Sequence, residues 1–254
     1  MFGDLKEDWT CWILSQYLLE KHYGHVSLVT DRLGKYLLCD ILRIPFDDID
    51  VCMDDYIGHF PTAAWVSGKI LACKRQHEPF MLVDHDVFMW KKLSGEIENA
   101  PLFAQSIELF DNNESERVHS HYNMDDLDSI CSGVDCWEVY KAAHPMGHYA
   151  YSLGVYGGTD IGSLSFYSDT CMDVIIKSMD KAFEEKRALI LDQMMFAVCS
   201  FFRNVSVACI LKDYHGWGEV SVDNEFTHLW GNQNMIQRIM PGIASSRSRF
   251  VMVA

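Results

Sequence analysis

Residues 78–90 read EPFMLVDHDVFMW, and this stretch is the best guide to the fold. Its apolar run, 80–83, is too short for a helix and predicts a buried strand of a mostly parallel sheet. Asp84 and Asp86 follow at once, in a turn. Ligands of open α/β sheets bind beyond the carboxyl ends of the strands. Two carboxylates there suit a hard divalent cation that also binds substrate phosphates, whereas the simpler alternative is an acidic loop that closes a core strand.

The size and charge of the chain limit its class. A chain of 254 residues can bury a substantial core. Its formal net charge of −15 argues against nucleic-acid binding, because phosphate backbones require a basic surface. The same charge argues against docking on anionic membranes. We also find no apolar run near the roughly 20 residues that a membrane helix needs.

The cysteines and the first residues indicate a compartment. Nine cysteines are present, an odd number, and no two are spaced as Cys-x-x-Cys. The opening MFGDLKED is polar and acidic, unlike a secretory signal. We therefore expect reduced thiols in a cytoplasmic protein.

Helices and strands are expected to alternate along the chain. Apolar residues recur with helical spacing between residues 8 and 20, where Asp8 is a plausible N-terminal cap. Alternation of this kind is typical of a single α/β domain. The acidic stretch 51–60 is expected to be irregular, and 111–132 to be a long loop, either an acceptor-side lid or a plain insertion. Further helices are predicted at 36–42, 62–76, 136–143, 164–183, 186–202 and 232–239, and strands at 25–30, 102–110, 149–158 and 205–211.

Three later segments carry candidate functional residues. In HLWG, His228 precedes a tight backbone position at Gly231; a structural histidine is the alternative. The glycines of YSLGVYGG, 151–158, allow close approach of a backbone to a ligand, although glycine-rich strand exits are common. Asp192 and Gln193 interrupt an apolar helix, where polar groups must find partners unless they lie on its one wet face.

Histidines and cysteines also form a loose set in the middle of the chain. A structural zinc site would need about four of them to converge. Their spacings match no standard zinc motif, so this is a minor alternative. The set comprises His119, His121, Cys131, Cys136, His144 and His148.

Taken in order, these segments resemble the GT-A superfamily of nucleotide-diphospho-sugar transferases over residues 9–235. The similarity is greatest to bacterial GT-A-like proteins and more distant to the glycogenin and lipopolysaccharide galactosyltransferase family. It implies one Rossmann-like domain with a nucleotide and metal half at 1–110 and a sugar and acceptor half at 133–254. The segments that carry it are LSQY 14–17, LVTD 28–31, WVSGK 65–69, EPFMLVDHD 78–86, YSLGV 151–155, Asp-Gln 192–193 and His-x-x-Gly 228–231.

The resemblance implies a cation site. Asp84 and Asp86 would bind a Mn²⁺ or Mg²⁺ ion that bridges the diphosphate of a donor, most simply a UDP-linked sugar. His228 would be the third protein ligand. Gly231 would let the backbone approach the phosphates.

The resemblance also implies a sugar site. Tyr151, Ser152 and Gly154 would line the pocket for the sugar and for a glycan or other small acceptor. Asp192 would bind hydroxyl groups of the donor sugar, and Gln193 would lie near the anomeric carbon. Relatives of this type retain the anomeric configuration of the donor.

The sequence departs from the superfamily at three places. The chain begins at or just before the helix that follows the usual first strand, so that strand is expected to be missing. Ser152 and Leu153 stand where the galactosyltransferase relatives have Asn-Ala. Asn234 stands at the spacing of a phosphate-binding lysine, an electrostatic contact typically worth about 2.7–4 kcal/mol in the transition state.

The function expected from these observations is metal-dependent sugar transfer by a hexosyltransferase. The departures make a non-catalytic or degenerate nucleotide-sugar- or glycan-binding protein the alternative. A metal-dependent phosphohydrolase that uses the same two aspartates is a third hypothesis, and it predicts product release without any acceptor.

Overall fold

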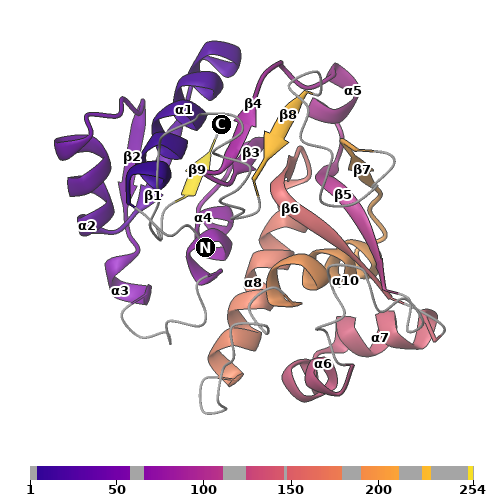
Figure 1. Cartoon of the computed structure of the whole chain (residues 1–254). Coiled ribbons are helices and arrows are strands. Elements are labelled where there is room, and N and C mark those ends of the chain that lie inside the picture. The colour runs from indigo at the N-terminus through magenta and orange to yellow at the C-terminus, as the bar shows by residue number, and fades with distance from the viewer. Residues whose placement is uncertain are drawn as a thin grey trace. The chain divides into compact units, whose positions relative to one another are not determined.

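Helices and strands alternate along the chain, in agreement with the predicted α/β class (Figure 1). The computed structural model describes residues 5–57, 66–110, 124–145, 148–178, 190–211, 225–229 and 251–253. The chain divides into two compact units, of which unit 1 comprises 1–56, 81–94 and 217–254, and unit 2 comprises 57–80 and 95–216. The units thus differ in their boundaries from the two halves expected at 1–110 and 133–254.

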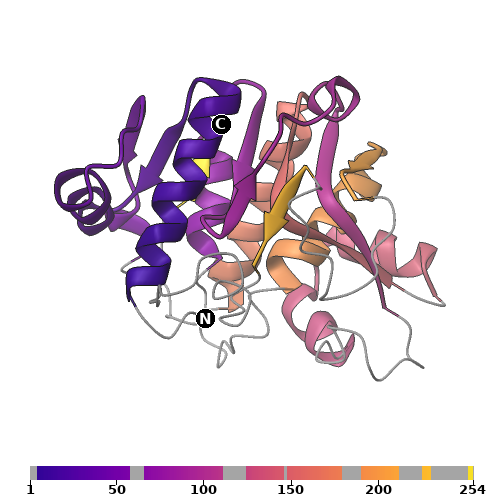
Figure 2. The ribbon, with the colours of Figure 1, turned by 45° about the horizontal axis from the view of Figure 1, so that its top comes forward.

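Unit 1 contains a sheet in the order β2-β1-β9-β3 and a separate pair of strands, β4 and β8. β1 is parallel to β2, whereas β9 is antiparallel to both β1 and β3. The helix α1 packs against β4 and crosses in front of β9 in Figure 2. The elements are α1 (Leu5–Tyr23), β1 (Ser27–Thr30), α2 (Arg32–Lys35), the π-helix η1 (Tyr36–Ile41), β2 (Asp48–Val51), α3 (Asp54–Ile57), β3 (Phe80–Val83), β4 (Val87–Met89), β8 (Phe226–His228) and β9 (Val251–Val253).

Unit 2 contains strands in the order β6-β5-β7. β5 is antiparallel to β6 and parallel to β7. The helices α4 and α7 pack against α8 and α10, respectively, and these two pack on each other. The elements are α4 (Ser67–Lys74), α5 (Gly95–Glu98), β5 (Leu102–Phe110), α6 (Met124–Cys131), α7 (Asp135–Ala143), β6 (His148–Gly158), α8 (Ile161–Ser178), the π-helix η2 (Ile190–Met194), α10 (Met195–Phe202) and β7 (Val207–Cys209).

The strand pairing is mixed, whereas the sequence predicted a mostly parallel sheet. In unit 1 the last strand, β9, runs antiparallel between β1 and β3. In unit 2 the longest pairing, β5 with β6, is also antiparallel. Nothing in a short apolar segment specifies the direction of its neighbour, because parallel and antiparallel partners both pair through the same backbone N–H and C=O groups.

Two local predictions are corrected by the helices. The expected loop 111–132 ends earlier, because 124–131 form α6, where Ile130 and Cys131 are buried; the rest, 111–123, lies outside the described residues. The expected irregular stretch 51–60 contains α3. The helix expected at 232–239 also lies outside the described residues.

The apolar pattern predicted only part of the buried face of helix α1. Among its residues, Trp12 and Leu18 are buried, whereas Ile13 and Tyr17 are 46% and 58% exposed. Asp8, the expected cap, lies within α1 and is buried. The buried face of the helix thus includes polar side chains, which a search for apolar periodicity overlooks.

Gly158 is at a position where the backbone of Pro101 leaves no room for a side chain. Its φ is +151°, and a Cβ atom there would lie 2.1 Å from the carbonyl oxygen of Pro101. The conformational freedom of this glycine thus admits the Pro101 backbone, where the sequence suggested close approach to a ligand.

Asp160 caps helix α8, and its removal is expected to destabilise the protein in a pH-dependent way. Its carboxylate accepts hydrogen bonds from the backbone N–H of Ser163 at 3.0 Å and from the Ser163 hydroxyl at 2.7 Å. The bonds from Ser163 lower the pKa of Asp160. Asp160→Ala should cost about 1 kcal/mol of unfolding free energy at neutral pH.

The pH dependence follows from the lowered pKa. A carboxyl group with a depressed folded-state pKa stabilises the fold above its unfolded pKa of 3.8, and loses this contribution as the pH falls through the folded value. Urea unfolding at pH 7 and pH 3 should therefore show a smaller difference between wild type and variant in acid. Asp173→Ala, an exposed position on the same helix, is the control. An equal effect of the two substitutions would contradict the cap.

The structure joins none of the nine cysteines, all of which lie in the described ranges, to another. Among the described helices, none combines the length and the apolar character needed to cross a bilayer.

Candidate functional site

The β3–β4 turn and strand β8 bring three predicted residues of unit 1 together. Asp84 and Asp86 lie in the turn, which is closed by a hydrogen bond from the Val87 N–H to the Asp84 carbonyl at 3.0 Å. β4 pairs antiparallel with β8, and Val87 lies directly opposite His228. The Leu229 N–H donates to the Asp86 carbonyl at 3.1 Å. This pairing holds His228 beside the turn although the two segments are far apart in the sequence.

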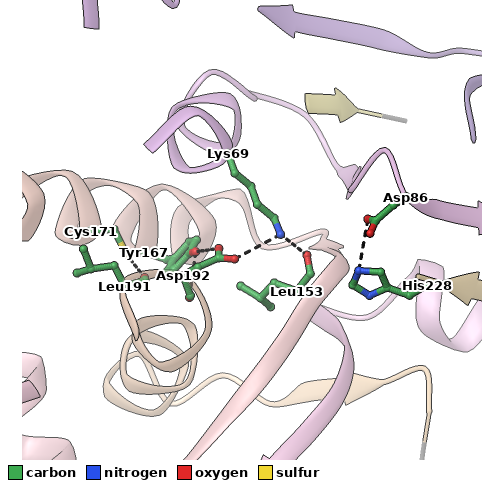
Figure 3. Close-up of polar contacts among 8 residues, drawn as sticks. All are labelled: Lys69, Asp86, Leu153, Tyr167, Cys171, Leu191, Asp192 and His228. Atoms are coloured by element: carbon green, nitrogen blue, oxygen red, sulfur yellow. Dashed lines mark hydrogen bonds and ion pairs between the residues drawn. The ribbon is translucent and has the colours of Figure 1, made fainter. Parts of the chain in front are cut away.

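Asp84, Asp86 and His228 converge closely enough to share an ion. Each offers one ligand atom, and these atoms lie within 4.8 Å of one another. The His228 imidazole is turned toward the Asp86 carboxylate, with 3.4 Å between Nε2 and Oδ1 (Figure 3). Asp86 and His228 are 7% and 9% exposed, whereas Asp84 is half-buried. In the described part of the chain, this is the one such group of three.

The chemistry of the three side chains fits a hard divalent cation. An ion with ligands at about 2.1 Å separates any two of them by at most about 4.2 Å. The three donor atoms are therefore near this limit, and small side-chain rotations would be needed for all three to bind one ion. Carboxylate donors suit both Mn²⁺ and Mg²⁺, and an imidazole nitrogen is a common ligand of transition-metal ions. Three protein ligands leave coordination positions for phosphate oxygens or water.

His85, between the two aspartates, faces helix α1. Its Nε2 lies 2.7 Å from Asp8 Oδ1, and its ring stacks on that of Trp12 at 5.1 Å and 9°. Burial alone lowers the pKa of His85, but the hydrogen bond to Asp8 and the surrounding carboxylates outweigh it and raise the pKa. This contact was not predicted, because Asp8 was expected to be a helix cap.

Unit 2 contains a second cluster, in which Lys69 and Asp192 form a buried ion pair. Lys69 Nζ lies 3.4 Å from Asp192 Oδ2 and donates to the Leu153 carbonyl at 2.5 Å (Figure 3). The side chains of Lys69 and Asp192 are only 7% and 3% exposed. The hydroxyl of Tyr167 donates to Asp192 Oδ1 at 3.1 Å, and Lys69 Nζ lies 5.5 Å from the centre of the Tyr156 ring. Burial and then the charge of Asp192 raise the pKa of Tyr167, which keeps its proton.

Asp192 and Gln193 lie on the π-helix η2. Turns of this kind are rare and frequently occur at functional sites. Gln193 is half-buried, and its Oε1 atom is buried without a hydrogen-bond partner among the described residues. An amide oxygen in this state is available to a donor group of a ligand.

The other predicted sugar-site residues lie in strand β6. Tyr151 is 8% exposed and packs against Phe196, with 5.9 Å between the ring centroids. Ser152 is buried opposite Ser106, next to an irregularity in the β5–β6 register. Gly154 is buried in the same strand. The contacts of Tyr151 and Ser152 are thus those of core residues.

Gly231 and Asn234 lie outside the described residues, as do His119 and His121 of the loose His/Cys set. The remaining members of that set form no three-residue ligand group within the described ranges.

Lys69 is the functional candidate that sequence reasoning missed. It lies in the WVSGK segment that carried part of the resemblance, and the residues after it, Ile70 to Cys73, are buried. A lysine at the start of such an apolar run indicates a buried ion pair, because Lys is almost never fully buried unless it is paired.

Comparisons with known proteins give a family and no function. Neither the curated proteins nor the solved structures contain a match to the chain. A family model matches residues 2–244, which is most of the chain. The chain therefore belongs to a family of unknown function, DUF6734.

Proposed function

We propose that this protein is a metal-dependent glycosyltransferase of GT-A type, which transfers a sugar from a nucleotide-diphosphate donor to an acceptor. The observation that carries the proposal is the convergence of Asp84, Asp86 and His228 within 4.8 Å. These residues come from two distant segments, and the resemblance assigned all three to one cation. An acidic loop that only closes a strand requires no histidine beside it.

The three ligands would hold Mn²⁺ or Mg²⁺ against the donor diphosphate. The bound cation would supply Lewis acidity that offsets the charge on the departing nucleoside diphosphate. The net charge of −15 adds to this need, because an acidic protein repels a diphosphate. Asp86 and His228 are well suited as fixed ligands since both are buried and their backbones are joined through β4 and β8.

In unit 2, Asp192 and Gln193 would bind the donor sugar. Lys69 and Tyr167 each approach one carboxylate oxygen of Asp192 and so fix its orientation. The Oε1 of Gln193, which has no hydrogen-bond partner in the described part of the chain, would be a further acceptor.

Calorimetry with Mn²⁺ and UDP tests the proposal most directly. We expect UDP to bind only when Mn²⁺ is present, followed by donor hydrolysis or transfer in a panel of UDP- and GDP-sugars. Absence of both binding and turnover across the panel would count decisively against it. Release of inorganic phosphate from the diphosphate, with no dependence on a sugar, would instead identify a phosphohydrolase.

A non-catalytic nucleotide-sugar- or glycan-binding protein is the second candidate. The observation that favours it is the burial of Asp192, which is 2% exposed and already bonded to two side chains. The departures at Ser152 and Asn234 point the same way. Turnover of any donor that is abolished by Asp86→Ala would eliminate this candidate.

A further inference from the structure

One face of helix α1 holds the β3–β4 turn through three contacts. Asp8 lies 2.7 Å from Nε2 of His85, Trp12 stacks on the His85 ring at 5.1 Å, and the Ser15 hydroxyl donates to the Val87 carbonyl at 2.6 Å. Asp8, Trp12 and Ser15 are spaced i, i+4 and i+7, which places them on one side of the helix. All three are buried, at 1% exposure or less.

The turn residues that make these contacts, His85 and Val87, are next to the proposed cation ligands in the sequence. His85 lies between Asp84 and Asp86, and Val87 follows them. The side chains of a three-residue turn can adopt several arrangements. A part-buried hydrogen bond and a stacked ring on the middle residue, His85, restrict the directions of its two neighbours. With the His85 ring directed at α1, Asp84 and Asp86 both have an oxygen in reach of His228.

The chemistry of the contact also requires an explanation. A buried carboxylate is costly unless it is paired, and apolar residues would join α1 to the turn without that cost. Unlike apolar packing, the hydrogen bond between His85 Nε2 and Asp8 Oδ1 has a preferred direction and length, so it orients the His85 ring.

We infer that Asp8 and His85 are positioning residues, which orient the β3–β4 turn so that Asp84 and Asp86 can bind a divalent cation together with His228. This inference rests on the cation site of the proposed function. It adds that the affinity of the site depends on Asp8 and His85, a pair of side chains that would not be ligands of the ion.

Titration of the full chain with Mn²⁺ alone tests the inference without any substrate. The electron paramagnetic resonance signal of the free ion measures how much Mn²⁺ remains unbound. Outer-shell partners of metal sites are typically worth 10–100-fold in affinity. We expect Asp8→Ala and His85→Ala to raise the Kd for Mn²⁺ at least about tenfold. His85→Gln, whose amide can still donate to Asp8, should restore affinity to within about threefold of wild type.

Two controls separate the possible failures. Gln16→Ala removes another buried polar side chain of α1, one that donates to the Pro45 carbonyl, and should leave the Kd unchanged. If wild type does not bind Mn²⁺, or if Asp86→Asn binds it equally well, the cation site itself is wrong. If wild type binds and Asp86→Asn does not, while His85→Ala keeps wild-type affinity, the positioning role alone is overturned. Because Asp8→Ala can fail to fold, the comparison of His85→Ala with His85→Gln decides the question, with circular dichroism as the check on folding.

Discussion

Asp86→Asn is expected to abolish Mn²⁺ binding and, with it, turnover of any donor. Asp86 is 7% exposed and its carboxylate lies 3.4 Å from the His228 imidazole. Asparagine keeps the size of the side chain but removes the negative charge that a hard cation requires. Since an outer-shell partner alone is worth 10–100-fold, loss of a direct ligand should raise the Kd by more than about 100-fold. Loss of the electrostatic stabilisation of the leaving group should lower kcat by about 10²–10³-fold.

Calorimetry with Mn²⁺, with and without UDP, measures the first effect, and initial rates with an active donor measure the second. Asp55→Asn is the matched control, because it removes one carboxylate from an exposed position on α3 in the same unit. It should leave both the Kd and kcat within about twofold of wild type, as surface charges contribute little. Equal effects of the two substitutions would assign the loss to net charge and refute a specific site. His228→Gln, like Asp86→Asn, should raise the Kd for Mn²⁺.

Sequence reasoning succeeded where the deciding information was local. The run 80–83 is continuous and apolar, and such runs form buried strands, as β3 does. Asp84 and Asp86 follow that strand directly, so their place at its end could be predicted. The convergence with His228 needed more, namely the order of motifs in the resemblance, because no local rule pairs β4 with β8.

Where the prediction failed, the cause was a contact between distant residues. The antiparallel β9 joins residues 251–253 to β1 and β3, and no pattern in three apolar residues specifies that partner. Asp8 was predicted as a cap since acidic residues favour helix starts, but its partner is His85, 77 residues away. Lys69 and Asp192 are 123 residues apart, so their pairing was not visible in the sequence, although Asp192 itself was singled out.

The ion pair of Lys69 with Asp192 gives the largest expected effect on stability. Lys69→Met keeps the length of the side chain but leaves the Asp192 carboxylate, 3% exposed, without the ammonium group. Removing one partner of a buried pair typically costs 3–5 kcal/mol, because an uncompensated charge stays in the interior. For a chain of this size that corresponds to a fall in Tm of roughly 10 °C. Thermal and urea unfolding of the two proteins measure it.

The same helix supplies the control that makes this test specific. Lys74 also lies on α4 and pairs with Asp169, but the side chains of Lys74 and Asp169 are about half exposed, at 45% and 51%. Lys74→Met should therefore cost less than about 1 kcal/mol. The double substitution Lys69→Met with Asp192→Leu removes both charges and should recover most of the loss, since apolar replacements of buried pairs are often neutral or stabilising. If the double substitution recovers stability but loses donor binding, the role of Lys69 and Asp192 is to bind the ligand. If Lys69→Met costs no more unfolding free energy than Lys74→Met, the pair is not buried in solution.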